Sequence, residues 1–600
     1  MCGIAGSIIN TKLTNLKVSQ LLNLMRNRGP DNQSFNEFKI NKKKLYFFSS
    51  RLKIVDRVDR SNQPMTFDEI TIIFNGEIYN YDELRKKLIR KNIKIKTKSD
   101  TEIILRLYQI YGTNCVNHLE GMWAFAIYDK SKEAIFISRD RIGEKPLYYF
   151  KKNGQFHFGS QTSFIRKLVS NNSINQDKIL NYLTYGYKTI ERDNESFYKN
   201  IFKLDPGTNL IINKNLEFKF VKYWHPKVFE KSLSEKNVNN NIFYSLNNSI
   251  SEVCKSNLKI GLSLSGGIDS NLLLSFFTKK LDKRNITTYS IIDNDPRYNE
   301  SELINYASKT YGVKNCQIIL KPDDNHLENL DKLIHYHDKP ISTINYFLQS
   351  YIYKSMASDS IKISINGNGA DEMFAGYYQH YQLYYQSLKN KNDKNIFKKN
   401  WKKYIAPLLR NNEFKNLDKK QIKSFFTFFG KNELKKKFKK NIREEFFVKN
   451  VLKNKMANEF FYQTLPLALH EDDLNSMFYS IENRSPFLNR SLVEFCFSLE
   501  SKHFMKDSFN KYLLRKNSKN ILKDKIRLNR EKKGFNASFD SVFSFDNKKF
   551  KEWFFEKSSP IFHLIDRKVF LKKFQRSGLK ELGQQSLFNI CSTKLFLEKN

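Results

Sequence analysis

The chain has 600 residues, 40% of them hydrophobic, with 51 Phe and 31 Tyr. This composition supports large cores in about two to four domains and excludes an intrinsically disordered protein. No stretch approaches the roughly 20 apolar residues of a membrane span, and the start of the chain lacks the charged and apolar regions of a secretory signal. We therefore expect a soluble protein of the cytoplasm.

The formal net charge of +41 could indicate a nucleic-acid partner. The basic residues are, however, spread over the whole chain, and the densest runs, residues 389–403 and 435–440, lie in polar, helix-prone segments. Runs of this kind are typical of solvated faces, so we do not expect specific nucleic-acid binding. The six cysteines occur singly, and they predict neither a zinc site nor a disulfide framework.

Cys2 is the first candidate catalytic residue in chain order. Removal of the initiator methionine, which a small second residue permits, would place a thiol and a free α-amino group on one residue. The amine titrates near ~7.7–8 and the thiol near ~8.5, so at neutral pH the amine can act as the base for the thiol. A cysteine at this position alone is more often without function, and the interpretation depends on the motifs that follow.

Six motifs accompany Cys2. They are residues 28–31 (RGPD), 51–56 (RLKIVD), 75–80 (NGEIYN), 99–102 (SDTE), 120–129 (EGMWAFAIYD) and 139–149 (RDRIGEKPLYY). Together they resemble the class II glutamine amidotransferase domain, an N-terminal-nucleophile fold of two stacked antiparallel sheets between helical layers. The short alternating runs 69–74 and 124–128 agree with such strands. We place this domain at residues 2–225.

The resemblance implies a glutaminase site. Cys2 would attack the side-chain amide of glutamine, and Asn75 with the N–H of Gly76 would form the oxyanion hole. Arg51 would hold the α-carboxylate, while Asp100 and Glu77 would receive the α-ammonium and the side-chain amide. The implied glutamine-binding set is Arg51, Leu52, Lys53, Ile54, Val55, Asn75, Gly76, Glu77 and Asp100.

Two positions depart from the pattern of that family. The His that usually stands shortly before the Arg is absent from residues 48–50, which are Phe-Ser-Ser, and Gln161 stands where Glu is usual. Neither position carries the chemistry, so we expect altered detail and retained activity.

The pattern changes after residue 225. The polar stretch 226–241 is predicted to be a linker, and a second domain follows over residues 242–600. Apolar runs at 260–264, 287–292, 316–320 and 361–365 predict strands with helices between them. Such alternation favours an α/β unit with a parallel sheet, which binds ligands at the carboxyl ends of its strands. We therefore expect an α+β domain followed by an α/β domain with a helical C-terminal part.

The loop at residues 264–270 (LSGGIDS) follows the first of these strands and opens a helix. Its glycines permit a sharp turn, and the unpaired N–H groups and dipole of the helix start favour an anion such as phosphate. The alternative is an ordinary tight turn. A Ser-Gly-Gly-x-Asp-Ser pattern between a buried strand and an apolar helix is more specific than a lone Gly-Gly, and it favours phosphate binding.

A second glycine-containing loop, residues 365–377 (INGNGADEMFAGY), follows the last predicted strand. Asp371 would lie near Asp269 of the first loop, at the tips of neighbouring strands. Two carboxylates beside a polyphosphate suit Mg²⁺. The alternative for Asp371 and Glu372 is an acidic pair that complements a helix dipole, but the repeated glycine context favours the metal site.

Both loops resemble the ATP-pyrophosphatase signature and its partner loop in glutamine-hydrolysing asparagine synthetases. Further similar stretches are 475–488, 511–515 (KYLLR) and 530–535 (REKKGF), so the resemblance covers nearly the whole chain. It implies an enzyme with two sites. Aspartate would react with MgATP to give β-aspartyl-AMP and pyrophosphate, and ammonia made at Cys2 would pass through an internal tunnel and displace AMP.

The same resemblance assigns residues of the second site. Asp269 and Asp371 would bind Mg²⁺, and Lys532 would neutralise charge on the attacked phosphate, although one more solvated lysine is the alternative in so basic a chain. The family also suggests a homodimer. The implied ATP contacts are Leu264, Ser265, Gly266, Gly267, Asp269, Ser270, Ile291, Asn366 and Gly367.

Asn368 leaves the identity of the acceptor open. Asparagine synthetases commonly carry an acid at this position, thought to assist formation of the acyl-adenylate, and an amide cannot take up a proton. Asparagine synthesis is the leading interpretation. The alternatives are the same chemistry on another carboxylate, such as a sugar acid of surface polysaccharide synthesis, or a basic nucleic-acid-modifying ATP pyrophosphatase. The last would leave the glutaminase motifs unexplained.

Overall fold

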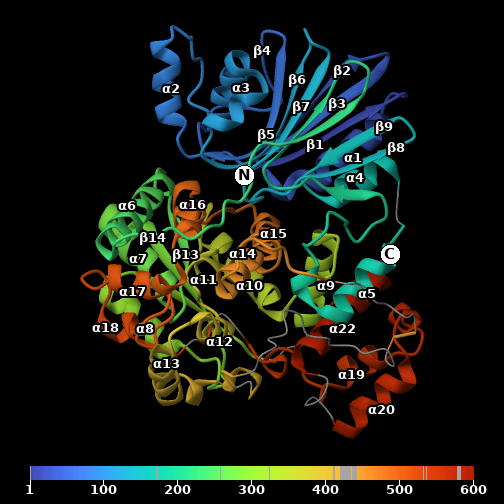
Figure 1. The fold of residues 1–600 in the computed structure, drawn as a ribbon. Coiled ribbons are helices and arrows are strands. Elements are labelled where there is room, and N and C mark those ends of the chain that lie inside the picture. Colours follow the sequence, from blue (N-terminus) through green and yellow to red (C-terminus); the bar gives the residue numbers. More distant parts are fainter. Residues whose placement is uncertain are drawn as a thin grey trace.

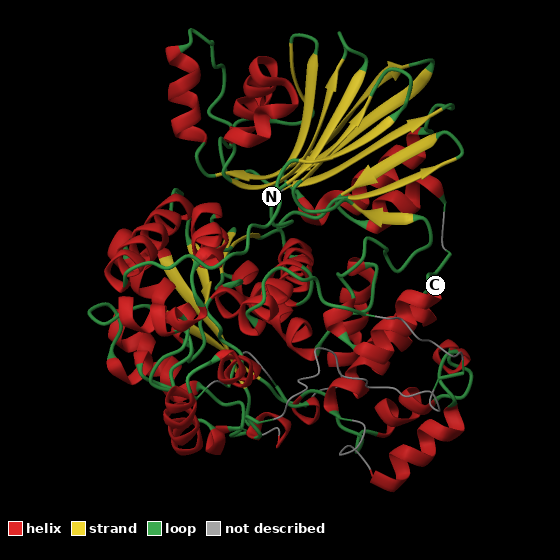
Figure 2. Cartoon of the chain, in the orientation of Figure 1, coloured by secondary structure: helices red, strands yellow, loops and turns green. Residues whose placement is uncertain are grey.

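The structure of the protein, a computed structural model, describes residues 2–170, 173–256, 258–322, 325–409, 412–418, 434–435, 442–531, 533–534, 537–577 and 583–600. Lys532, the predicted charge-neutralising lysine, lies outside these residues. Figures 1 and 2 show two sheets in the N-terminal part and a smaller sheet surrounded by helices in the rest of the chain.

Two antiparallel sheets of six strands each form the N-terminal unit. In spatial order the first contains β10 (Ile201–Lys203), β8 (Tyr148–Lys152), β9 (Gln155–Gly159), β1 (Cys2–Ile9), β3 (Lys43–Arg51) and β2 (Asn32–Ile40). The second contains β12 (Phe218–Lys222), β11 (Thr208–Ile212), β7 (Ala134–Arg139), β6 (Gly121–Asp129), β5 (Ile70–Ile78) and β4 (Met65–Phe67). Apolar side chains of both sheets, among them Ile4, Phe47, Ile73 and Ile137, share one core.

Helices cover the outer faces of this sandwich. α1 (Asn15–Met25) and α4 (Thr162–Val169) pack on the first sheet, where Leu21 and Phe164 join a core beneath them. α2 (Tyr81–Arg90) and α3 (Asp100–Tyr111) cover the second sheet. Ser99 caps α3 because its hydroxyl accepts the N–H of Thr101 at 3.1 Å. The predicted stacked sheets between helical layers are confirmed.

A five-stranded parallel sheet forms the core of the second unit. In spatial order it contains β15 (Lys314–Ile319), β14 (Ile286–Ile292), β13 (Ile260–Ser263), β16 (Ile363–Ile365) and β17 (Glu482–Arg484). The four predicted strands are present with slightly different ends, and β17 is an addition to them. The chain leaves β13 toward β14 and later returns to its other side as β16, so the switch point for a ligand lies between β13 and β16.

Helices surround this sheet and continue to the end of the chain. α6 begins at Glu235, inside the stretch that we predicted to be a linker. The helices of this part are α6 (Glu235–Val253), α7 (Ile268–Lys280), α8 (Ser301–Tyr311), α9 (Asn325–His337), α10 (Ile344–Ser358), α11 (Ala370–Met373), α12 (Tyr378–Ser387), α13 (Lys391–Tyr404), α14 (Val451–Phe461), α15 (Thr464–Phe478), α16 (Arg490–Ser498), α17 (Tyr512–Asn517), α18 (Asp524–Arg527), α19 (Lys548–Phe555), α20 (Arg567–Ser577) and α22 (Gln584–Glu598).

The two units share an extensive interface. α5 (Gln176–Tyr185) of the N-terminal unit packs against α22 in a common apolar core (Figure 1). Buried charges cross the interface as well. The guanidinium of Arg28 donates to both oxygens of Asp473 on α15, at 2.8 and 3.2 Å, and Glu77 of β5 pairs with Arg484 of β17 at 2.7 Å. Within the described part of the chain, no helix has the length and apolar character to cross a membrane.

Candidate active sites

Cys2 begins β1, in register with Arg51 of β3. Its side chain is buried, and burial raises the pKa of its thiol. The backbone N–H of Cys2 donates to Oδ1 of Asn75 at 3.1 Å. Nδ2 of Asn75 is buried, and no described residue accepts a hydrogen bond from it. The Asn75 side chain, which contacts the backbone of Cys2, thus has a buried donor that suits a developing oxyanion.

Gly76 follows Asn75 on β5, opposite Trp123 of β6. Its φ of 152° lies in the region that favours glycine, and a Cβ at this position would meet the carbonyl oxygen of Met122 at 2.1 Å. Only glycine allows β5 and β6 to approach this closely.

Arg51 lies at the end of β3 and is almost fully buried. Its guanidinium donates to the carbonyl oxygens of Val55 and Val58, at 3.2 and 3.1 Å, and to Oδ1 of Asn62 at 2.9 Å. These acceptors are neutral, and no salt bridge joins Arg51 to a described carboxylate. A buried cation in this state suits a substrate carboxylate.

The loop after β3 contains the four residues of the predicted glutamine-binding set that follow Arg51 in sequence, namely Leu52, Lys53, Ile54 and Val55. The N–H of Lys53 donates to Oδ2 of Asp31 at 2.8 Å, so the residue 28–31 motif holds this loop in place. Leu52 is buried beside Cys2, and its N–H opposes the rise of the Cys2 pKa that burial causes.

Asp100 and Glu77 differ in their surroundings. Oδ2 of Asp100 accepts the N–H of Ile78 at 3.1 Å, and burial raises the pKa of Asp100 to about 6. Glu77 instead forms the buried ion pair with Arg484 that joins the two units. Arg484 lies in the stretch 475–488 that resembles asparagine synthetases, but we predicted no role for it, because it lies 407 positions from its partner Glu77.

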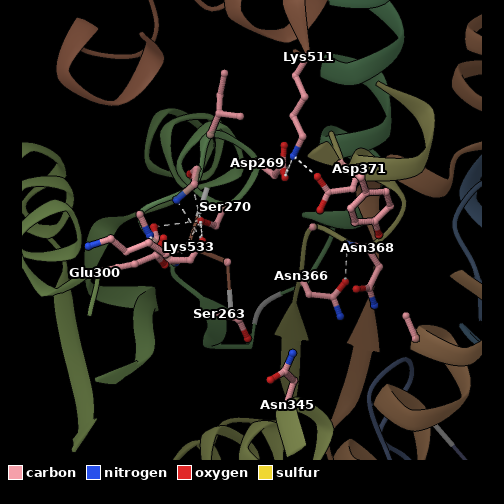
Figure 3. Close-up of a pocket in the computed structure, with 18 of the residues that line it drawn as sticks. Ser263, Asp269, Ser270, Glu300, Asn345, Asn366, Asn368, Asp371, Lys511 and Lys533 are labelled. Atoms are coloured by element: carbon pink, nitrogen blue, oxygen red, sulfur yellow. Dashed lines mark hydrogen bonds and ion pairs between the residues drawn. The ribbon is translucent and has the colours of Figure 1, made fainter. Parts of the chain in front are cut away.

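The second site is a cavity of about 590 Å³ at the carboxyl ends of β13 and β16 (Figure 3). It brings together both glycine loops as predicted. Ile291, the remaining predicted ATP contact, lines a smaller cavity beside Leu264 and Ser265. The predicted residues that line the main cavity are Leu264, Ser265, Gly266, Gly267, Asp269, Ser270, Asn366, Gly367, Asn368 and Asp371.

The first loop forms the start of α7, with Gly267 as its N-terminal cap residue. The hydroxyl of Ser265 accepts the N–H of Gly267 at 3.2 Å. The N–H of Gly266 donates to Oε2 of Glu300 at 3.1 Å. Burial raises the pKa of Glu300 to about 7, although this N–H acts in the opposite direction. Sequence reasoning missed Glu300, which occupies a donor of the predicted phosphate loop.

Asp269 and Asp371 converge on one cation, the ammonium of Lys511 (Figure 3). Burial alone lowers the pKa of Lys511, but the two carboxylates more than offset it and the net shift is upward. No cluster of three metal-ligating side chains occurs among the described residues. Two convergent carboxylates nevertheless fit Mg²⁺, which takes its other oxygen ligands from phosphate and water.

Comparisons with known proteins show which family the chain is similar to. Residues 1–224 match the family model of the glutamine amidotransferase domain, and residues 242–598 match that of asparagine synthase. A putative glutamine-hydrolysing asparagine synthetase 2 of Methanocaldococcus jannaschii is 30% identical over 405 residues, 64% of this chain and 77% of the relative. The glutamine-hydrolysing asparagine synthetase 1 of Bacillus subtilis is 25% identical over 564 residues, 89% of this chain and 87% of the relative.

The fold, the two sites and these matches define an ATP-dependent amidoligase that takes its nitrogen from glutamine. The chain belongs to the family of glutamine-hydrolysing asparagine synthetases.

Proposed function

We propose that the protein catalyses L-aspartate + L-glutamine + ATP + H₂O → L-asparagine + L-glutamate + AMP + diphosphate, through a β-aspartyl-AMP intermediate. The observation that carries the proposal is the convergence of Asp269 and Asp371 on one cation beside the glycine loop of the larger cavity. This geometry supports metal-assisted adenylation, and the site at Cys2 supports ammonia from glutamine as the nucleophile.

In the glutaminase half, Sγ of Cys2 attacks the side-chain carbonyl carbon of glutamine. Once Met1 is removed, the α-amino group of Cys2 takes the thiol proton and passes it to the departing ammonia. Nδ2 of Asn75 and the N–H of Gly76 hold the oxyanion, and water then hydrolyses the thioester to glutamate. The unpartnered Nδ2 of Asn75 within the described structure supports this role.

In the synthetase half, a β-carboxylate oxygen of aspartate attacks the α-phosphorus of ATP, and the bond to diphosphate breaks. Ammonia then attacks the acyl carbon, and AMP leaves. Asp269 and Asp371 would hold Mg²⁺, which when bound neutralises phosphate charge. The first loop would bind diphosphate through its N–H groups and hydroxyls. Lys532, which lies outside the described residues, would neutralise charge on the attacked phosphate.

A second candidate acceptor follows from Asn368. Its amide cannot serve as a base, so another carboxylic acid, such as a sugar acid, is the alternative substrate of the same chemistry.

The test is release of diphosphate by the purified protein with ATP, Mg²⁺ and glutamine or ammonia, in the presence of L-aspartate or of a panel of other acids. We expect diphosphate and AMP in proportion to aspartate. Absence of aspartate-dependent diphosphate, with glutamine hydrolysis intact, would exclude asparagine synthesis. A homodimer and a cytoplasmic location stay predictions, which light scattering and cell fractionation would test.

A further inference from the structure

One residue of the N-terminal unit lines the larger cavity of the second unit. α5 ends at Tyr185, and the single helical turn Tyr187–Thr189 comes shortly after it. Tyr187 lies in the cavity wall, and every other described residue of that wall belongs to the second unit. Tyr187 also packs against the apolar core that α5 shares with α22. The N-terminal unit thus reaches the cavity in which we propose adenylation, through a segment outside every motif described above.

Lys188, the next residue, makes a charged contact between the units. Its ammonium pairs with the carboxylate of Glu459 on α14 at 3.0 Å, and the side chain of Glu459 is only 1% exposed. Burial alone would lower the pKa of Lys188 and raise that of Glu459. Attraction between the opposite charges more than offsets burial, so the pKa of Lys188 is raised and that of Glu459 lies well below its usual value. Lys455 also approaches Glu459, at 3.8 Å, but it lies closer to Glu444, at 2.6 Å. Lys188 is therefore the main cation that balances this buried charge.

The other oxygen of Glu459 contacts His380 of α12. Oε2 of Glu459 lies 2.8 Å from Nε2 of the imidazole ring. Nδ1 of the same ring accepts the backbone N–H of Tyr377 at 3.3 Å. A ring nitrogen that accepts a hydrogen bond carries no proton, so the proton of His380 is on Nε2 and is donated to Glu459. The charge of Glu459 thus sets the tautomer of His380 and makes Nδ1 the acceptor that holds Tyr377.

Tyr377 precedes α12 directly and is also part of the cavity wall. Its hydroxyl donates to Oε1 of Glu372 at 2.5 Å, and Glu372 lines the cavity next to Asp371, the predicted metal ligand. The N–H of Gly376, beside Tyr377, donates to the carbonyl oxygen of Asp371 at 2.8 Å. The conformation of the loop that contains Asp371 therefore depends on a series of contacts that begins at Lys188.

Loss of the Lys188 ammonium would leave Glu459 as a buried charge that is poorly balanced. His380 could then neutralise it by taking up a second proton, on Nδ1. A protonated nitrogen cannot accept the N–H of Tyr377, so the start of α12 would lose this contact and the hydroxyl of Tyr377 would no longer be held toward Glu372.

On the basis of the function proposed above, we propose that Lys188 of the N-terminal unit is a positioning residue for the reaction in the larger cavity. Its charge balances Glu459, which sets the tautomer of His380. His380 in turn holds Tyr377 and the second glycine loop in place. Adenylation then depends on the docked N-terminal unit as well as on the residues of the second unit, even when ammonia is supplied from solution.

The test uses Lys188→Met, which keeps much of the length of the side chain and removes its charge. Diphosphate release is measured with ATP, L-aspartate and ammonia, so that glutamine hydrolysis plays no part. We expect kcat to fall at least tenfold, because the second glycine loop is no longer held in place. The KM for ATP should change less than threefold, since the first glycine loop is untouched, and glutamine hydrolysis, measured separately, should stay within twofold.

Lys178→Met is the matched control. Lys178 belongs to α5 of the same unit, is buried and pairs with Asp193, but it does not line the larger cavity. Both substitutions remove a buried cation and should lower the midpoint of thermal unfolding. Only Lys188→Met should lower kcat for diphosphate release.

Two double variants separate a positioning role from a structural one. Adding Glu459→Gln to Lys188→Met removes the unbalanced charge and keeps an acceptor for His380, so kcat should recover to within threefold of the unchanged protein. Tyr377→Phe removes the hydroxyl that donates to Glu372. If Lys188 acts through Tyr377, Lys188→Met with Tyr377→Phe should lose no more than about twofold beyond the larger single loss, whereas independent effects would multiply. A role of Lys188 in stability alone would not produce this non-additivity.

Lys188→Gln serves as a second variant if Lys188→Met does not fold, because its amide can still donate to Glu459 but carries no charge. An unchanged kcat in either folded variant, or an equal fall in Lys178→Met, would overturn the positioning role of Lys188 alone. Absence of aspartate-dependent diphosphate release by the unchanged protein would instead overturn the proposed function, and this is measured before any substitution is made.

Discussion

Nζ of Lys511 lies 2.7 Å from Oδ1 of Asp371, and the same ammonium also pairs with Asp269. One cation therefore balances the two carboxylates that we predicted as metal ligands from separate loops. Lys511 itself lies in the KYLLR stretch at the start of α17. The two carboxylates and the lysine form one electrostatic unit, which suggests two different experiments.

Replacement of Asp371 by Asn should abolish synthesis. The variant keeps the shape of the side chain but removes one of the two charges that would hold Mg²⁺. We expect diphosphate release to fall at least a hundredfold, while glutamine hydrolysis at the distant Cys2 stays within twofold. Rates of both half-reactions on the same preparation check this, and retained diphosphate release would remove Asp371 from the metal site.

Replacement of Lys511 by Met should make the protein depend on a metal ion for stability. Without the ammonium, the half-buried carboxylates of Asp269 and Asp371 lose the cation that both contact, and their mutual repulsion should lower the free energy of unfolding. Mg²⁺ should then raise the midpoint of thermal unfolding of the variant more than that of the unchanged protein. Equal responses to Mg²⁺ would show that the two carboxylates do not form a cation site.

Replacement of Cys2 by Ala should separate the two half-reactions. The variant loses its nucleophile, so glutamine-dependent synthesis should disappear. Ammonia supplied in solution should still support synthesis at a rate within about threefold of the unchanged protein, since the substitution does not change the larger cavity at β13 and β16. If ammonia-dependent synthesis also failed, the assignment of two separate sites would be wrong.

The sequence predicted the strands that carry the second site because apolar runs mark β13, β14 and β16. It could not predict β17, whose three residues are Glu482, Asn483 and Arg484. They are buried, but Arg484 pairs with Glu482 and with Glu77 of the other unit. A strand whose burial rests on charge pairing has no hydrophobic signal.

Local motifs predicted which loops line the cavity, but not which distant side chains complete them. Glu300 reaches Gly266 from the start of α8, and Asp472 reaches Asn368 across 104 positions of sequence. Neither residue belongs to a motif of its own. Their positions depend on how helices pack against the sheet, which periodicity and spacing do not specify.

Replacement of Asp473 by Ala should destabilise the whole protein. It leaves the fully buried guanidinium of Arg28 without its carboxylate, at a cost of about 3–5 kcal/mol. Nε of Arg28 also donates to the carbonyl oxygen of Cys2 at 3.1 Å, so glutamine hydrolysis should fall as well. Asp524→Ala is the matched control, because the pair between Asp524 and Arg527 has an exposed carboxylate and should contribute about 0–1 kcal/mol. Urea unfolding of both variants checks the difference, and similar losses would contradict it.

Replacement of Glu300 by Gln should remove a pH dependence of ATP binding. Glu300 accepts the N–H of Gly266, so when ionised it competes with phosphate for the loop and repels it. Burial raises its pKa from the usual 4.5 to about 7, although Lys533 acts against this shift. The carboxyl is therefore mainly neutral at pH 6 and mainly ionised at pH 8.

The direction of the effect follows from these two states. ATP binds better to the neutral form, so its affinity for the unchanged protein should fall as the pH rises from 6 to 8, by up to about tenfold per pH unit for a single proton. The phosphates of ATP also change protonation over this pH range, and this affects both proteins equally. Dividing the dissociation constant of the unchanged protein by that of Glu300→Gln removes this contribution. Calorimetric titration at pH 6, 7 and 8 without acceptor should give a ratio that rises with pH. A ratio that stays constant would show that Glu300 leaves the loop in both protonation states when ATP binds.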